Sequence, residues 1–276
     1  MWEYRVKEII LYFQSQTGRQ WLSTRSREQA GEPDFTVCGT ELSFLEALFL
    51  KRETDGVVVF TDYVRAATAY SAKGGAAVGL LCEENRDASF EGVTFLVESP
   101  DAFDRSYAEL VYARKKDLPC FILETGRCIL RETTEEDVAA FYGIYEEPSI
   151  TRYMENLFAD PQEERAYIEA YRKSMYGFYG FGIWTVILKE TGEIIGRAGL
   201  DLRQESGLPE LGFVIGVPWQ GRGIAFEVCD GILRYAKEEL DLSVIQAVTE
   251  QGNQASESLL RKLGFSGHDG LWEKKI

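Results

Sequence analysis

A glycine-rich turn opens a helix near the C-terminal third of the chain. The residues Gln220-Gly221-Arg222-Gly223-Ile224-Ala225 follow an apolar stretch over 211–217. Glycines let backbone N–H groups approach a phosphate closely, and the helix dipole adds partial positive charge at the same point. The spacing is neither that of a dinucleotide-binding fingerprint nor that of a P-loop, which ends in Gly-Lys-Ser/Thr. The turn therefore predicts an anion site at a helix N-terminus.

The elements around this turn predict a mixed arrangement of strands and helices. In Thr133-Thr-Glu-Glu-Asp137 a threonine N-cap precedes acidic residues in the first turn of a helix. A short glycine-containing turn at 190–192 joins two alternating strands into a hairpin. The expected order is a strand over 127–132, helices over 133–145 and 161–174, strands over 182–189, 193–202 and 210–217, the helix from Gly223, a strand over 243–250, a helix over 253–263 and a short hairpin over 264–276.

The N-terminal part of the chain alternates strands and helices regularly. Short apolar runs over 56–62, 76–82 and 92–97 are interleaved with helical segments over 63–72 and 101–114. This alternation predicts a parallel sheet of Rossmann-like topology. Ahead of it we expect a strand or short helix over 8–13, a loop-rich stretch over 15–33 and a helix over 42–51. Because Pro119 breaks the linker at 116–120, the predicted domains are residues 1–119 and 120–276.

About 60 residues of the first domain vaguely resemble the tail of a haloacid-dehalogenase-like domain. The resemblance rests on a strand that ends in Thr61-Asp62 and on the later Gly92-Val-Thr-Phe-Leu-Val-Glu98. The Asp-x-Asp nucleophile motif of that family is missing, so we interpret this domain as catalytically silent. Asp62 is either a ligand contact at a strand end or, as we prefer, the N-cap of the following helix.

Two more motifs accompany the glycine-rich turn: Glu210-Leu-Gly-Phe213 before it, and Asn253-Gln-Ala-Ser256 with Lys262-Leu-Gly-Phe265 after it. Together with the order of elements, they resemble the GNAT superfamily of N-acetyltransferases over residues 126–276. The match is closest to the branch typified by enzymes that acetylate ribosomal-protein N-termini. The resemblance implies a mixed, mostly antiparallel sheet in which the strand of Glu210 splays from its neighbour at a bulge.

The resemblance also implies residues that hold acetyl-CoA. The pantetheine arm would pair like an extra strand with Phe213, Val214 and Ile215. The pyrophosphate would lie on Gln220, Gly221, Arg222, Gly223, Ile224 and Ala225, with Arg222 adding a charge. Asn253 would hold the pantetheine or order its loop, and its alternative role is a helix N-cap. No metal is implied.

Acetyl transfer to an amine requires control of protons. The amine must lose a proton before it attacks, and Glu210 is the candidate base, directly or through water. The alternative for Glu210 is a surface glutamate at a strand edge. Many members of the family have a tyrosine that acts as general acid at the position of Leu260. Without it, the proton for the departing thiolate must come from water or from a hydroxyl such as that of Ser256 or Ser258, unless the enzyme does not assist this step. We interpret Glu227 as a buried structural partner.

The acceptor wall is expected to come from two segments, Thr151–Glu155 and the aromatic run Tyr176–Trp184. Aromatic rings combined with glutamates can hold a cationic amine. The alternative is core packing beside a glycine-rich loop. The substrate-binding candidates are Tyr153, Glu155, Tyr179 and Trp184.

Composition limits the possible partners and the compartment. The net charge is −15 and both halves of the chain are acidic, which argues against nucleic acid and would attract an amine, although solubility explains it equally well. No apolar run reaches the length of a membrane span. Five scattered cysteines without a Cys-x-x-Cys pair argue against disulfides or zinc and favour the cytoplasm.

The sequence therefore predicts an acetyl-CoA-dependent N-acetyltransferase that acts on a primary amine. A peptide N-terminus, a polyamine, an aminoglycoside and other metabolites are all open as acceptors, as are the role of residues 1–119 and the oligomeric state. The alternative function is an acyl-CoA sensor whose N-terminal domain binds a ligand or a partner. Leu260 in place of tyrosine keeps this alternative open.

Overall fold

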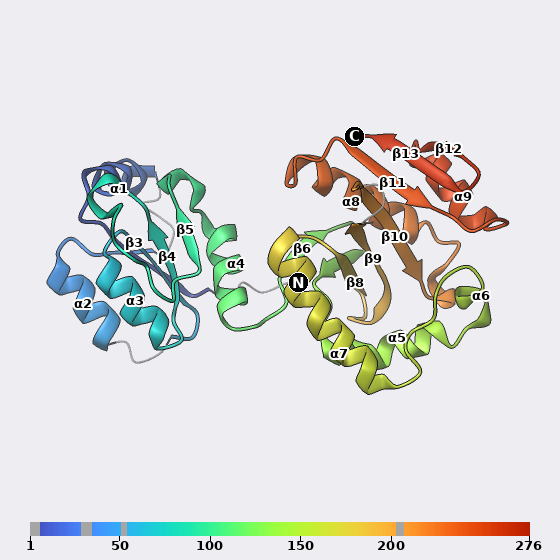
Figure 1. Cartoon of the computed structure of the whole chain (residues 1–276), viewed down its shortest axis with the longest axis horizontal. Helices are drawn as coiled ribbons and strands as arrows, with labels where there is room; N and C mark the ends of the chain where they lie inside the picture. Colours follow the sequence, from blue (N-terminus) through green and yellow to red (C-terminus); the bar gives the residue numbers. More distant parts are fainter. Residues whose placement is uncertain (1–5, 29–34, 51–53, 203–206) are drawn as a thin grey trace. The chain divides into compact units, whose positions relative to one another are not determined.

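The computed structural model describes residues 6–28, 35–50, 54–202 and 207–276, and the chain divides into two compact units (Figure 1). The first unit comprises residues 1–120 and the second residues 121–276. The division falls directly after Cys120, close to where helix α4 ends at Lys115. None of the helices in these described ranges is both long enough and apolar enough to cross a membrane.

The first unit is built on an all-parallel sheet, which confirms the predicted topology. The strand order is β2-β1-β3-β4-β5. Strands β3 and β4 are buried along their whole length because helices cover both faces. The strands are β1 (Glu8–Tyr12), β2 (Phe35–Val37), β3 (Val57–Thr61), β4 (Ala76–Leu80) and β5 (Phe95–Val97).

Two helices cover each face of this sheet. Phe44 of α2 and Tyr70 of α3 pack on one face, and Trp21 of α1 and Val111 of α4 pack on the other. The prediction of a loop-rich stretch over 15–33 was wrong for its described part, because α1 occupies most of it and Trp21 anchors the helix to the core. The helices are α1 (Gln16–Glu28), α2 (Glu41–Leu50), α3 (Val64–Ala72) and α4 (Arg105–Lys115).

Asp62 fixes the loop that follows β1. Its two carboxylate oxygens accept hydrogen bonds from the backbone N–H groups of Gln14 and Ser15, each at 2.7 Å. The preferred interpretation of Asp62 as a helix N-cap was wrong, because Tyr63 precedes α3 and no side chain caps it. Sheets of this strand order bind ligands at the carboxyl ends of β1 and β3. Here the backbone N–H groups of Gln14 and Ser15 in that loop are already hydrogen-bonded to the carboxylate of Asp62.

The second unit contains an eight-stranded sheet in the order β12-β13-β11-β10-β9-β8-β7-β6. Neighbouring strands are antiparallel except for β10 and β11, so the predicted mixed, mostly antiparallel sheet is confirmed. The strands are β6 (Phe121–Glu124), β7 (Cys128–Arg131), β8 (Ile183–Leu188), β9 (Ile194–Leu202), β10 (Pro209–Ile215), β11 (Val244–Val248), β12 (Ser266–His268) and β13 (Leu271–Lys275).

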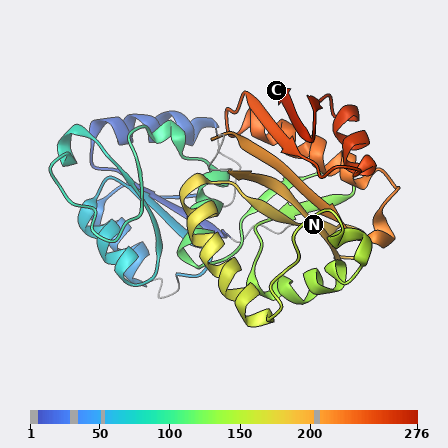
Figure 2. The same cartoon turned by 45° about the vertical axis from the view of Figure 1, so that its right-hand side comes forward.

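Helices pack on both faces of this second sheet (Figure 2). Helices α8 and α9 share the main core with Trp184 and Leu200, whereas α5, α6 and α7 cover Ile194 and Val214 on the other face. Helix α7 continues into a π-helix over Arg172–Tyr179. The helices are α5 (Val138–Tyr145), α6 (Pro148–Thr151), α7 (Pro161–Tyr171), α8 (Ile224–Glu238) and α9 (Gln254–Lys262).

Candidate active site

The second sheet opens between strands β10 and β11. Strand β10 pairs with β9 without interruption from Pro209 to Ile215, but it pairs with β11 only where Glu210 lies opposite Gln246. The two parallel strands therefore part directly after Glu210. The predicted splay is present, but the bulge that we expected is not seen as a register shift between β9 and β10.

Strand alternation decides which backbone groups face this opening. The N–H of Gly216 donates to the carbonyl of Ile195 on β9 at 2.8 Å. In an antiparallel strand, the N–H and C=O of one residue point to one neighbouring strand, and those of the next residue point to the other side. Val214 is two residues from Gly216, so its backbone groups also face β9. The backbone groups of Phe213 and Ile215 therefore face the opening. Val214 is thus wrong as a backbone partner for a ligand strand. The side chain of Gln220 already donates to the Ile215 carbonyl at 2.8 Å.

The glycine-rich turn has the conformation of an anion cradle. Gly221 and Gly223 have φ values of 70° and 75°, a region that costs a residue with a side chain about 1–2 kcal/mol. Gly223 is the N-cap of α8, and it has no side chain that could cap the helix. The N–H of Glu227 donates a hydrogen bond to the Gly223 carbonyl at 3.1 Å. The N–H groups ahead of Glu227, those of Ile224 and Ala225 among them, lie where an anion binds a helix.

An ion pair from the turn between β6 and β7 braces the glycine-rich turn. The backbone N–H and the Nε of Arg127 donate to the two oxygens of Glu227 at 2.7 and 2.6 Å. The Nη1 of Arg127 also donates to the carbonyl of Arg222 at 2.9 Å. Burial works against the charged form of Glu227, but hydrogen bonds from Thr125 and Arg127 outweigh it and lower the pKa. These contacts support the interpretation of Glu227 as a structural partner, but its side chain is 23% exposed and not buried as expected.

The remaining predicted catalytic residues lie on β10 and α9. Glu210 is half-buried at the start of β10, and its Oε2 is shielded from solvent. The Oδ1 of Asn253 accepts the N–H of Ser256 at 3.2 Å, so Asn253 is a helix N-cap as the alternative held. Leu260 is fully buried in the main core, so this position of α9 faces the core.

The family model described as an acetyltransferase (GNAT) domain matches residues 127–266. The chain belongs to the GNAT acetyltransferase family. The uncharacterized N-acetyltransferase YoaA of Bacillus subtilis is 33% identical over 148 residues, which are 52% of this chain and 82% of that protein. The [ribosomal protein uS5]-alanine N-acetyltransferase of Escherichia coli is 32% identical over 120 residues, which are 40% of this chain and 60% of that protein.

Solved structures of GNAT proteins also overlap the second unit. A crystal structure of RimL, a ribosomal L7/L12 α-N-protein acetyltransferase in complex with coenzyme A, has a TM-score of 0.48 and 14% identity. It covers 56% of this chain and 98% of its own. A GNAT-family acetyltransferase from Bordetella pertussis has a TM-score of 0.47 and 22% identity, over 55% of this chain and 98% of its own.

The structure separates the four predicted acceptor residues of this GNAT unit. Trp184 is fully buried and packs edge-on against Tyr235 of α8, on the face of the sheet opposite Glu210, so it was wrong as a substrate contact. Tyr153 lies under the guanidinium of Arg152, 5.1 Å from its centre, and Glu155 is exposed. Tyr179 is 47% exposed at the end of the π-helix.

Sequence reasoning missed Asp201, which lies directly opposite Glu210 on strand β9. The next opposite pair on the same face of the two strands consists of two glycines, Gly199 and Gly212. The available signal was a pair of charged residues on one face of β9, Arg197 and Asp201, with Gly199 between them. Its meaning depends on the register with β10.

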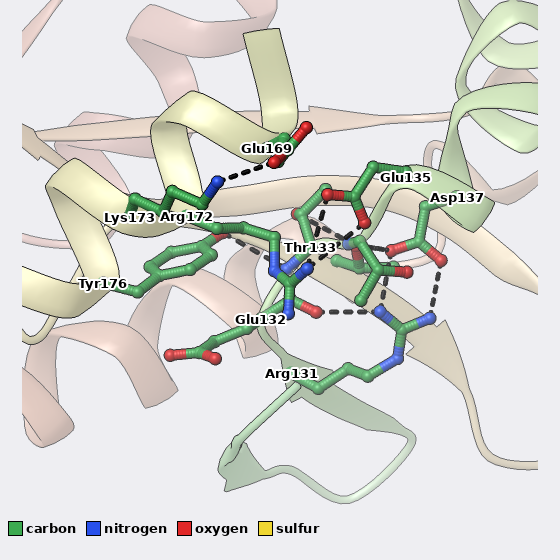
Figure 3. Close-up of polar contacts among 11 residues, drawn as sticks. Arg131, Glu132, Thr133, Glu135, Asp137, Glu169, Arg172, Lys173 and Tyr176 are labelled. Carbon is green, nitrogen blue, oxygen red and sulfur yellow. Dashed lines mark hydrogen bonds and ion pairs between the residues drawn. The ribbon is translucent and has the colours of Figure 1, made fainter. Parts of the chain in front are cut away.

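A polar network holds the helices that flank this GNAT site (Figure 3). Arg131 of β7 pairs with the buried Asp137 at 2.6 Å, which fixes the start of α5. Arg172, in the first turn of the π-helix, pairs with Glu135 at 3.2 Å. The hydroxyl of Tyr176 accepts the backbone N–H of Thr133 at 3.2 Å. The segment after β7 and the π-helix are thereby tied together beside the sheet.

Proposed function

We propose that this GNAT acetyltransferase transfers the acetyl group of acetyl-CoA to a primary amine, with Glu210 as the general base. The observation that carries the proposal is the position of Glu210. It stands at the pair after which β10 and β11 part, so its carboxylate adjoins the opening that would hold the donor. Family membership supports acetyl-CoA as the donor, and the uS5 relative, named as an alanine N-acetyltransferase, supports an amine acceptor.

The residues of the site fit the two polar parts of coenzyme A. Backbone groups of Phe213 and Ile215 face the opening and would pair with the amides of pantetheine, as in strand addition. The pyrophosphate would lie on residues 220–225, where Gly221 leaves open space in front of the backbone and Arg222 is exposed. We further propose that Asn253, whose Oδ1 is engaged as an N-cap, contributes its amide N–H₂.

Acetyl-CoA, when bound, supplies the thioester carbonyl to which the amine nitrogen bonds while the carbon–sulfur bond breaks and coenzyme A leaves. Glu210 would accept the proton of the ammonium group, whose pKa near 10 keeps it charged at neutral pH. The N–H of Phe213 would donate to the carbonyl oxygen as negative charge develops there. Ser256, in the first turn of α9, is the candidate to hand a proton to the departing sulfur.

The test is Glu210→Gln, with the exposed Glu193→Gln of the β8–β9 turn as the matched control. We expect kcat at neutral pH to fall roughly 10²- to 10⁴-fold while acetyl-CoA binding stays the same, because only general-base catalysis is removed. The assay is thiol release with trialanine amide, spermidine and butylamine. Unchanged turnover would eliminate Glu210 as the base. Tight acetyl-CoA binding by the unmodified protein without turnover on any amine would support the sensor alternative.

We also propose that the reaction takes place in the cytoplasm. The five cysteines of the chain are scattered without a Cys-x-x-Cys pair, and four of them are buried. Free thiols persist in a reducing compartment. Localisation of a tagged full-length chain by cell fractionation would test this assignment.

A further inference from the structure

A second carboxylate stands beside the proposed base. Asp201 and Glu210 are directly opposite in the antiparallel register of β9 and β10, so their Cβ atoms are about 5 Å apart on the same face of the sheet. This is the face that carries Val214 and is covered by α5 and α6. Like charges directly opposite on a sheet repel each other. A cation bound between the two carboxylates converts that repulsion into attraction.

The sheet beside this pair presents bare backbone. The adjacent opposite residues are Gly199 and Gly212. A Cβ on Gly199 would lie 2.0 Å from the carbonyl oxygen of Gly182, so the chain itself fills that side. A Cβ on Gly212 would meet only the Cδ1 of Ile183, at 3.3 Å, among the described atoms. The Cδ1 of Ile183 therefore covers the backbone of Gly212, next to Glu210.

Tyrosines of α7 stand over the same region. Burial, followed by the charge of Asp201, raises the pKa of both Tyr167 and Tyr171. The hydroxyl of Tyr171 accepts the backbone N–H of Ile183 at 2.8 Å, so this wall contacts the sheet beside Gly212. Tyr167 is 45% exposed, and its ring lies 5.9 Å from that of Tyr171. Aromatic faces beside a carboxylate favour a cation.

A purely structural role for Asp201 would be an ion pair with Arg197, two residues earlier on the same face of β9. The guanidinium of Arg197 lies instead over the ring of Phe141, 4.7 Å from its centre, and its charge opposes the rise that burial causes in the pKa of Tyr145. Both rings belong to α5. The Oδ1 of Asp201 accepts the backbone N–H of Leu202 at 2.9 Å.

We propose that Asp201 binds the ammonium group of the acceptor beside Glu210, on the side of Tyr167, and so selects cationic primary amines. The inference rests on the proposed function, because the acceptor must reach Glu210. In this arrangement Asp201 holds the charged amine, and Glu210 takes its proton. Asp201 is then a specificity-determining residue that contributes to acceptor binding more than to turnover.

The test compares Asp201→Asn with Asp230→Asn, the same chemical change on α8 across the sheet, where Asp230 makes only an exposed ion pair with Arg234. With trialanine amide, spermidine and butylamine as acceptors at saturating acetyl-CoA, we expect Asp201→Asn to raise the acceptor KM roughly 10- to 100-fold with little change in kcat. Aniline, which is uncharged at neutral pH, should lose no affinity. Calorimetric binding of acetyl-CoA should be unchanged.

The outcomes separate the inference from the function on which it rests. Turnover by the unmodified protein with an unchanged acceptor KM in Asp201→Asn would overturn the inference and leave the acetyltransferase assignment intact. Equal losses for aniline and the cationic acceptors would also overturn it, because they would indicate a structural role. No turnover by the unmodified protein on any of these amines would overturn both. Partial recovery of the acceptor KM in Asp201→Glu would support the charge itself as the cause.

Discussion

The brace between Arg127 and Glu227 leads to a quantitative prediction about the glycine-rich turn. Replacing Glu227 with Gln keeps the shape of the side chain and one oxygen acceptor, but removes the charge that receives two donors of Arg127. The Nη1 bond of Arg127 to the Arg222 carbonyl would then lose its anchor. The variant therefore tests whether this ion pair holds the turn in its binding conformation.

The magnitude follows from the contacts and their exposure. Hydrogen bonds to a charged group contribute about 1.5–3 kcal/mol when buried. The two side chains are 45% and 23% exposed, so solvent screening reduces the loss to about 1 kcal/mol. We expect Tm to fall by about 2–4 °C, as for a domain of 150–250 residues. A turn that must be reordered on binding should weaken acetyl-CoA binding about fivefold.

The assays are thermal unfolding and calorimetric titration with acetyl-CoA, with exposed Glu238→Gln in the last turn of α8 as the control. Because the pKa of Glu227 is lowered in the folded state, its contribution is present above the ordinary value of 4.5 and is lost as the pH falls below it. The Tm difference between the variant and the unmodified protein should shrink accordingly. Combining the variant with Arg127→Ala should add almost nothing to the loss.

Two results would refute this reasoning. If Glu227→Gln lowered Tm but left the acetyl-CoA affinity unchanged, the ion pair would stabilise the fold without shaping the turn. If the two substitutions added independently, Arg127 and Glu227 would not act through each other.

Three further predictions concern neighbouring features. Gly223→Ala, at a φ of 75°, should cost about 1–2 kcal/mol and weaken acetyl-CoA binding, and an unchanged Tm and affinity would show that the turn tolerates a side chain there. Trp184→Phe should lower the free energy of unfolding by about 1–3 kcal/mol without changing the acceptor KM, because the ring lies in the core. A raised KM would indicate that Trp184 contacts the acceptor. Burial raises the pKa of Cys128 from 9.0 to about 11, so its contribution to stability should be complete below pH 9 and decline as the pH rises to 11. Cys128→Ala should therefore flatten the dependence of Tm on pH between 9 and 11, and the same slope in the variant and the unmodified protein would contradict this.

Much of the second unit could be predicted from the sequence because its local patterns are strong. The hairpin expected over 182–189 and 193–202 is β8 and β9 to within one residue at each strand end. The capping box after β7 is also present, with Thr134 as the N-cap and its N–H bonded to Asp137 at 2.9 Å. Helix α1 was missed because its sequence is almost entirely polar and Trp21 carries most of its contact with the core.

The site divides in the same way between local and long-range information. Glu210 and the turn at 220–225 belong to short sequence motifs that can be recognised locally. The place of Asp201 beside Glu210 follows only from the register of β9 against β10. Trp184 was misassigned because a period of two places a residue on one face of a strand without saying which face is the site. The register of β8 and β9, and the helices that cover them, settle that question.

The carboxylate of Asp62 in the first unit has one further consequence. The stability of a loop that is ordered by a dissolved anion varies with the logarithm of the anion's concentration relative to its dissociation constant. Asp62 is instead covalently part of the chain, so its effective concentration at the N–H groups of Gln14 and Ser15 is set by the fold and does not vary with the medium. The order of this loop is thereby independent of the supply of phosphate or any other free anion.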